Sequence, residues 1–214
     1  MKKNIFLISL LAILAVCAIT NVSTKVTETD KHIFTAVLKL DKPTPNLSFK
    51  EQIRIIKFVQ KKILAVAPIG AAIPYGKPRE PADLIKQASG LCYDRSRTLE
   101  KIYSWYGFTT RHVFILYKDT REKNKTTPNW TSIFNPHLQS HAITEVKTSK
   151  GWLAVDSNQE WIGLTRIGLP MALEKIYANQ NQFFYRPAFE GPRDREHPSQ
   201  EDRGGDLMVV FRTV

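Results

Sequence analysis

Three side chains that could cooperate in nucleophilic catalysis occur in order along this chain of 214 residues: Cys92, His141 and Asp156. A cysteine thiol with a pKa of about 8.5 is largely protonated at neutral pH, so it needs a partner to become an effective nucleophile. A histidine can take the thiol proton and return it to a leaving group, and a carboxylate can hold the imidazole in the required tautomer. These three residues are therefore the candidate catalytic groups, and they indicate a cysteine enzyme.

The local sequence around Cys92 predicts that this residue begins a helix. A Pro/Gly-rich loop ends at Gly90, Gly107 is a stop signal, and apolar residues recur at helical spacing between them (Leu99, Ile102, Tyr103 and Tyr106). The N-terminus of a helix carries partial positive charge and N–H donors, which favour a thiolate there. The backbone N–H of Cys92 is the expected oxyanion donor, and Gln87 is a side-chain candidate for the same role.

The two other candidate residues lie at the ends of a predicted β-hairpin. Residues 142–147 and 152–156 are β-prone, and the turn residues 148–151 join them as a four-residue loop. His141 precedes the first strand and Asp156 ends the second, so antiparallel pairing would bring the two side chains together. The fifteen residues between these positions suit two strands of about five or six residues and a tight turn.

Four motifs in this order resemble the transglutaminase-like superfamily, whose core is shared with papain-like cysteine proteases. They are G-x-C at 90–92, Y-G-F-T-T-R-H-V at 106–113, H-A-x-x-E-V at 141–146 and G-W-x-x-V-D at 151–156. The resemblance covers roughly residues 50–162 and implies an α+β fold in which a nucleophile helix packs on an antiparallel sheet. It also implies Cys92 as nucleophile, His141 as base and Asp156 as orienter. Ile143 departs from the pattern, because many members have an aromatic residue there.

The resemblance implies attack by the Cys92 thiolate on an amide carbonyl of a protein or peptide substrate, which gives a thioester acyl-enzyme. Hydrolysis of the thioester by water, as in a cysteine protease or amidase, is the favoured hypothesis. Transfer to a lysine amine, as in a protein-glutamine transglutaminase, is one alternative. A non-catalytic exported module that binds the cell envelope is another. No calcium-binding loop or cofactor motif is visible, so no cofactor is expected.

A metal site is a competing hypothesis for the same residues. His137 and His141 are four residues apart, and Cys92 and Asp156 could complete the ligand set. Pro136 and the β character of the residues after His141 argue against a helix that presents both histidines together. The sequence therefore favours catalysis over metal binding.

Asp94 introduces a negative charge two residues after the candidate nucleophile. It either disfavours the thiolate or forms an ion pair with Arg95 or Arg97. Its partner therefore bears on how reactive the thiol at Cys92 is.

Four further residues near the motifs have structural interpretations. His112 opens an apolar strand and is expected to be a structural histidine. Glu145 is expected to face solvent or an arginine from a strand. Trp152 and Trp161 flank the candidate aspartate and are expected to pack against the His–Asp pair.

The N-terminus has the pattern of a targeting segment. Lys2 and Lys3 precede an apolar run over 5–19, which is shorter than the about 20 residues needed to span a bilayer. Residues 1–18 therefore predict a signal peptide and export to the periplasm or the medium. An uncleaved anchor through residues 4–20 is the alternative, and lipidation of Cys17 is a third. After cleavage, Cys92 would be the sole cysteine, a thiol that has no partner for an internal disulfide.

The chain is strongly basic, with a net charge of +11 at pH 7. Such a charge predicts attraction to anionic surfaces, of which the cell envelope is the expected one. No Arg-rich block, phosphate-binding loop or zinc-ligand spacing is present, so the sequence gives no specific nucleic-acid signature.

The remaining elements are predicted from periodicity and stop signals. Residues 19–45 are expected to be a lead-in with a β-prone stretch over 33–40, and 46–214 to be the catalytic domain. Helices are predicted over 49–66, 83–87 and 171–178, and strands over 112–117 and 207–212. Residues 118–138 are expected to form an exposed loop near the site.

Overall fold

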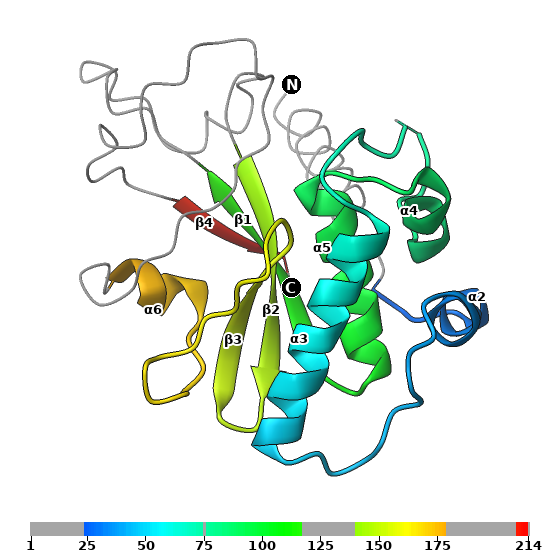
Figure 1. The fold of residues 1–214 in the computed structure, drawn as a ribbon. Helices are drawn as coiled ribbons and strands as arrows, with labels where there is room; N and C mark the ends of the chain where they lie inside the picture. The colour runs from blue at the N-terminus through cyan, green and yellow to red at the C-terminus, as the bar shows by residue number, and fades with distance from the viewer. Residues whose placement is uncertain (1–23, 75, 117–139, 179–208, 214) are drawn as a thin grey trace, which may run out of the picture.

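The computed structural model describes residues 24–74, 76–116, 140–178 and 209–213. Its centre is an antiparallel sheet of four strands in the order β3-β2-β1-β4, with helices packed against it (Figure 1). The strands are β1 (Thr109–Leu116), β2 (Ser140–Thr148), β3 (Gly151–Asp156) and β4 (Val209–Thr213). The predicted α+β class, with the nucleophile helix packed on an antiparallel sheet, is confirmed.

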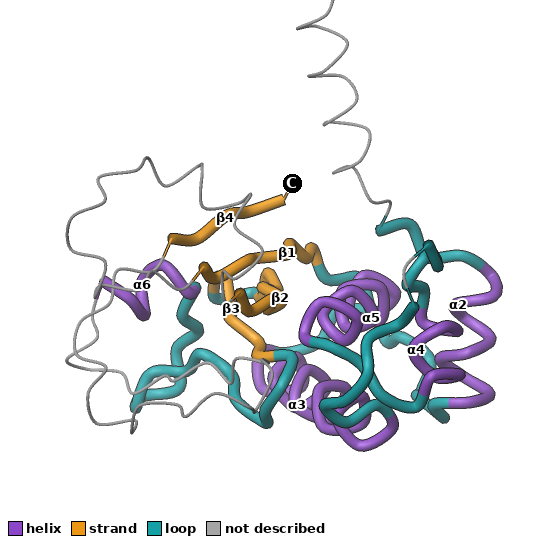
Figure 2. The backbone as a smooth tube through the Cα atoms, turned by 90° about the horizontal axis from the view of Figure 1, so that it is seen from above, coloured by secondary structure: helices purple, strands orange, loops and turns teal. Residues whose placement is uncertain are grey.

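Two long helices cover one side of the sheet, as predicted from their apolar spacing. The helix α3 (Phe49–Val66) begins with a capping box in which Ser48 and Glu51 bond each other's backbone N–H. The helix α5 (Cys92–Trp105) packs against β1, β2 and α3. Seen from above, α3 and α5 lie beside the strands, and the short helices α2 and α4 lie beyond α5 (Figure 2). The helix α5, which begins at the candidate nucleophile, therefore packs between the sheet and the other helices.

Residues 33–37 are helical and 38–40 are not in a strand, so the predicted β-prone stretch over 33–40 was wrong. The helix α2 (Glu28–His32) starts with a capping box made by Thr27 and Asp30 and continues into the π-helical turn η1 (Ile33–Val37). Phe34 and Leu38 are fully buried in the main core. Their spacing of four residues places both on one helical face, and this long-range packing outweighs the strand preference of the β-branched residues.

The hairpin β2–β3 is confirmed, with a tighter turn than predicted. Pairing continues to Thr148 and Gly151, so Ser149 and Lys150 alone form the loop. Strand β2 begins at Ser140, so the residue His141 lies within the strand instead of preceding it. The predicted helices over 83–87 and 171–178 correspond to α4 (Pro81–Gln87) and α6 (Leu173–Ala178).

Hydrophobic residues gather in two clusters on the two sides of the sheet. The larger one joins α3, α5 and η1 to Val146, Leu153 and Val155 of the hairpin. The smaller one joins α6 to alternate strand positions (Val113, Ile115, Ile143 and Ala154). The alternation of β2 and β3 residues between these clusters explains why the register of the hairpin is fixed.

Several predictions fall on residues that the structure does not describe. The signal peptide over 1–18, the lipidation site Cys17, the loop over 118–138 and His137 all lie there. In the described ranges, no helix is long and apolar enough to cross a membrane.

Candidate active site

Cys92 is the first residue of α5, and the loop before it is packed too tightly for a side chain at Gly90. A Cβ at that position would lie 2.7 Å from Leu84 Cδ1 and 3.2 Å from Asp94 Cβ. Gly90 also forms a β-bridge with Ile69, in the segment that follows α3. The sulfur is buried, with 9% of Cys92 exposed. The close packing of this loop holds the thiol at the helix start, where partial positive charge favours a thiolate.

His141 and Asp156 are in contact, as their positions in the hairpin predicted. His141 Nε2 lies 3.1 Å from Asp156 Oδ1, and both side chains are fully buried. The carboxylate also accepts hydrogen bonds from the backbone N–H of Asn158 (2.7 Å) and from Gln159 Nε2 (3.0 Å). These bonds fix the carboxylate, and through it the orientation of the imidazole.

The pKa of His141 reports its contact with both candidate partners. Burial acts to lower this pKa, but hydrogen bonds to Asp156 and Cys92, together with the charges of these two groups, raise it from 6.5 to about 9. The imidazole is therefore protonated at neutral pH. An imidazolium held between a carboxylate and a cysteine sulfur is the arrangement of a thiolate–imidazolium pair with an orienting acid.

The backbone around Asp156 is anchored by a residue that the sequence did not single out. Gln60 of α3 is buried, and its Nε2 donates to three carbonyl oxygens: Asp156 O at 2.7 Å, Trp161 O at 2.7 Å and Gln159 O at 3.0 Å. No spacing signal links position 60 to 156, because the two are 96 residues apart. Gln60 lies among apolar residues of α3, so the sequence pattern alone indicated a scaffold helix and gave no sign that this side chain bonds the backbone near Asp156.

A pair of buried hydroxyls joins the nucleophile helix to the histidine strand. Ser96 Oγ and Thr144 Oγ1 are 2.8 Å apart, and Thr144 Oγ1 also donates to Ser96 O at 3.1 Å. Ser96 lies four residues after Cys92, and Thr144 lies three residues after His141. The contact therefore fixes the separation between α5 and β2 close to the site.

Asp94 bonds neither of its predicted partners. Its carboxylate accepts hydrogen bonds from the backbone N–H groups of Leu91 (3.1 Å) and Ile73 (3.2 Å), and it forms an ion pair with Arg79. The expectation of a pair with Arg95 or Arg97 was wrong. Because Arg79 and two N–H donors compensate the negative charge, Asp94 organises the loop before Cys92.

Other expectations are confirmed in part. His112 is buried, with Nδ1 3.2 Å from Glu100 Oε2, in keeping with a structural role. Glu145 meets an arginine, since its Oε2 accepts from Arg111 Nε at 2.5 Å, but it is fully buried and does not face solvent. Trp152 stacks on Arg111, 4.0 Å from the guanidinium carbon to the ring centre, at the end of β3 away from Asp156. Its predicted packing against the His–Asp pair was wrong.

Trp161 lies nearer to the site than Trp152. Its carbonyl oxygen accepts from the Asp156 N–H at 3.1 Å, and its half-buried ring packs on the smaller core cluster. Gln87 is half-buried at the end of α4, and its role as an oxyanion donor stays a prediction. Among the described residues, no group of three or more His, Cys, Asp or Glu side chains is arranged to hold a metal ion.

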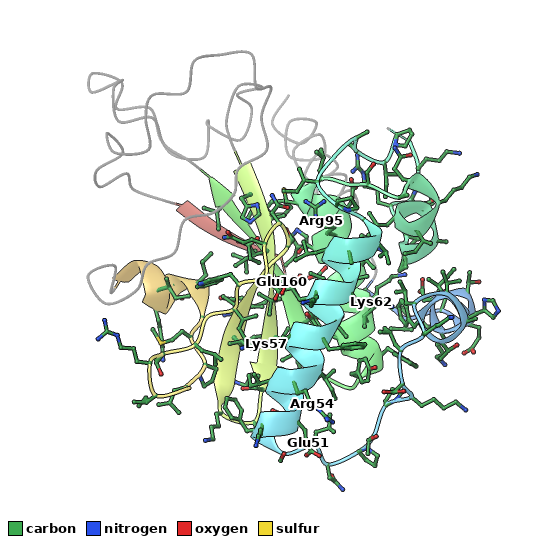
Figure 3. The ribbon with its side chains drawn as sticks, viewed as in Figure 1. Glu51, Arg54, Lys57, Lys62, Arg95 and Glu160 are labelled. Atoms are coloured by element: carbon green, nitrogen blue, oxygen red, sulfur yellow. The ribbon has the colours of Figure 1, made fainter. Side chains whose placement is uncertain are left out.

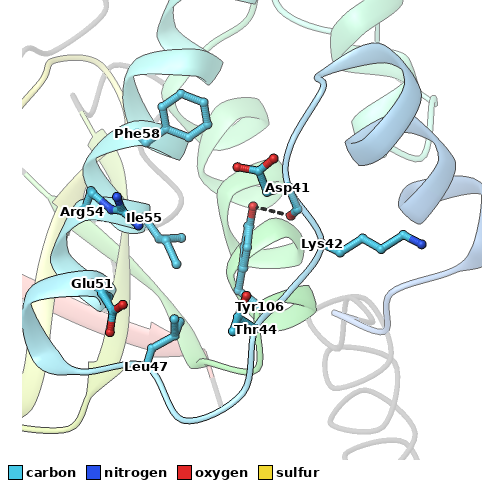
Figure 4. Close-up of a pocket in the computed structure, with 9 residues that line it drawn as sticks. All are labelled: Asp41, Lys42, Thr44, Leu47, Glu51, Arg54, Ile55, Phe58 and Tyr106. Carbon is cyan, nitrogen blue, oxygen red and sulfur yellow. Dashed lines mark hydrogen bonds between the residues drawn. The ribbon is translucent and has the colours of Figure 1, made fainter.

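A separate cavity of about 330 Å³ lies at the other end of α5 (Figure 4). It is lined by Tyr106 and by residues of α3 and the segment before it, including Arg54 and Phe58. The Tyr106 hydroxyl donates to Asp41 O at 2.8 Å, and burial together with the Asp41 charge raises the pKa of Tyr106 to about 12. Cys92 and Tyr106 are about 20 Å apart at 1.5 Å per helical residue, so this cavity is not part of the candidate active site.

No protein-family model matches the chain, and no curated protein matches it. Among solved structures, the chain is similar to arylamine N-acetyltransferase C from Bacillus anthracis, with 20% sequence identity and a TM-score of 0.35. The match covers 63% of this chain and 50% of the acetyltransferase, so it spans half the length of that protein.

Proposed function

We propose that this protein is a thiol-dependent amide hydrolase that works through Cys92, His141 and Asp156. The observation that carries the proposal is the position of His141, which is hydrogen-bonded to Asp156 and to a cysteine at the first position of a helix. This geometry supports a thiolate–imidazolium pair at neutral pH. The resemblance of the surrounding motifs to the transglutaminase-like superfamily points to the same chemistry.

In the proposed reaction, the Cys92 thiolate attacks the carbonyl carbon of an amide, and a C–S bond forms. The developing oxyanion is stabilised by backbone N–H groups at the start of α5. The His141 imidazolium gives its proton to the leaving amine as the C–N bond breaks, which leaves a thioester. Water then attacks the thioester, His141 takes up the proton, and the C–S bond breaks to release the carboxylic acid and restore the ion pair.

The test is the pH dependence of iodoacetamide alkylation at Cys92. The wild-type thiol is expected to react well below pH 8, and His141→Ala should lose this reactivity. His112→Ala is the matched control, because it removes another buried histidine from the same sheet. A wild-type profile centred near pH 8.5, unchanged by His141→Ala, would contradict the proposal, because it would describe an ordinary thiol.

The fate of the thioester separates hydrolysis from transamidation. Acyl-enzyme formed from a peptide-amide or activated-ester donor would be detected as added mass on Cys92 and then partitioned between water and a primary amine. We expect the acid as the main product. Predominant transfer to the amine would instead identify a transglutaminase.

A second candidate function is binding to an anionic envelope surface after export. The exposed face of α3 carries a stripe of cations with a half-exposed aromatic ring beside it (Lys50, Arg54, Lys57, Lys61 and Phe58). Figure 3 shows Arg54, Lys57 and Lys62 on this helix. A basic helix face with an aromatic residue supports contact with anionic phospholipid, and residues 1–18 support export.

Sedimentation with anionic lipid vesicles tests this surface, with neutral vesicles as the control. Binding should persist in Cys92→Ala and should be lost in the double variant Arg54→Glu and Lys57→Glu. Equal binding to neutral vesicles, or no effect of the double variant, would contradict the proposal. N-terminal sequencing of the exported protein would test cleavage after residue 18.

A further inference from the structure

Arg95 is a fully buried cation beside the candidate site. It lies three residues after Cys92 on α5, and it is among the largest of the fully buried side chains in the described ranges. Figure 3 shows it near the end of α3. A buried guanidinium requires several acceptors, because its charge and its N–H groups are removed from water. The position of those acceptors therefore indicates what Arg95 does.

Its N–H groups bond segments from three parts of the chain. Nη1 donates to Gly90 O at 2.5 Å and to Ala67 O at 3.3 Å, so the guanidinium holds the loop before Cys92 and the end of α3. Nε donates to Ser157 O at 2.6 Å, and Nη2 donates to Asn158 Oδ1. One planar group thus joins the loop that presents the nucleophile to the loop that follows Asp156.

Asn158 lies between Arg95 and His141 and contacts both. Because its Oδ1 accepts from Arg95, its Nδ2 faces away from the guanidinium and lies 3.4 Å from His141 Nδ1. The backbone N–H of the same residue donates to Asp156 Oδ1 at 2.7 Å. Asn158 therefore contacts both His141 and Asp156, while its side-chain orientation is set by Arg95.

We propose that Arg95 is a positioning residue that, through Gly90 and Asn158, holds Cys92 in register with His141 and Asp156. This inference rests on the proposed function, because the alignment matters only if the three residues react together. The planar fork of an arginine can serve four acceptors at once, whereas a lysine ammonium has three donors and no fixed plane. Arg95→Lys therefore keeps the buried charge but cannot bond all four acceptors of the guanidinium.

The experiment compares Arg95→Lys with Arg97→Lys. Arg97 lies two residues further along the same helix and is also buried, and its Nη2 donates to Glu80 Oε1 at 2.8 Å. Both variants are expected to lose thermal stability. Only Arg95→Lys should also slow alkylation of Cys92 at pH 6.5, by about tenfold or more, and lower the pH at which His141 titrates in NMR spectra.

Asn158→Ala provides a second, milder variant. It removes one acceptor of Arg95 and the amide beside His141, and leaves the bonds to Gly90, Ala67 and Ser157. We expect slower alkylation of Cys92, as for Arg95→Lys, with a smaller loss of stability. If Arg95→Lys fails to fold, this variant decides the question.

Two results would overturn the inference. One is an Arg95→Lys protein that is destabilised to the same degree as Arg97→Lys but keeps the wild-type alkylation profile and His141 titration. The other is an Asn158→Ala protein in which both readouts are unchanged. Failure of the proposed function is recognised separately, because the wild-type protein would then form no acyl-enzyme while the His141 titration would still respond to Arg95→Lys.

Discussion

The raised pKa of His141 makes a quantitative prediction about stability against pH. The imidazole titrates at about 6.5 when exposed and at about 9 in the folded protein. At about 1.4 kcal/mol per pH unit, this difference corresponds to about 3 kcal/mol of folding free energy. Because the folded pKa is the higher one, the contribution is fully present below pH 6.5 and is lost as the pH rises through 9.

Urea unfolding between pH 6 and 9.5 would measure this loss, with His141→Asn as the reference protein. The difference in unfolding free energy between the wild type and His141→Asn should fall by about 2–3 kcal/mol over that range. Histidine NMR should place the His141 midpoint near pH 9, and the His141→Asn spectrum would assign the signal. Subtracting the reference curve removes the contributions of titrating groups that do not interact with His141.

Two variants separate the contributions of Asp156 and Cys92 to the pH dependence of the unfolding free energy. Asp156→Asn removes the strongest of the contacts that raise the pKa, so it should abolish most of the pH dependence. Cys92→Ala leaves the bond to Asp156 in place and should retain a substantial part. A His141 midpoint near 6.5 in the wild type, or wild-type and His141→Asn curves that stay parallel from pH 6 to 9.5, would refute this reasoning.

Three further predictions concern residues that support the site. Gly90→Ala would place a Cβ 2.7 Å from Leu84 Cδ1, so it should destabilise the protein by about 1–3 kcal/mol in thermal unfolding, and Leu84→Ala added to it should cost less than the sum of the single changes. A double variant that shows full additivity would contradict this packing argument. Gln60→Leu removes the side-chain donor from one buried and two part-buried carbonyls and should cost about 2–3 kcal/mol in urea unfolding. Gln52→Leu, on the same helix with one side-chain bond to a carbonyl, is the control and should cost less. Equal costs for the two glutamine variants would count against an anchoring role. Glu145→Gln breaks the buried pair with Arg111 and should cost about 3 kcal/mol in urea unfolding, whereas a loss below about 1 kcal/mol would mean that the pair is solvated.

Local signals in the sequence were sufficient for the helices and the hairpin of the site. The helix over 49–66 was predicted with its observed bounds, because Ser48 caps it and its apolar residues repeat at three or four positions. The start of α5 at Cys92 and the pairing of 142–147 with 152–156 were predicted for the same kind of reason. In each case, the deciding interaction lies within a few residues of the element.

Contacts between distant segments could not be predicted in this way. The ion pair of Asp94 with Arg79 and the three bonds of Gln60 depend on how loops meet in space, and many polar residues were equally available as partners. The helical conformation of 33–37 has the same cause, since it is the burial of Phe34 and Leu38 against α3 and α5 that selects it. Sequence therefore predicted the contact of His141 with Asp156 and the helix start at Cys92, but it did not predict what holds them there.

The pairing of β4 with β1 has a consequence for the order of folding. His112 pairs with Thr213, 101 residues later, whereas the hairpin that carries His141 and Asp156 closes over a two-residue turn. Local pairs form early and distant ones late, because a long loop must lose entropy before its ends meet. During synthesis, the outer edge of β1 therefore stays open until residues 209–213 emerge, and before then this edge can pair with another molecule.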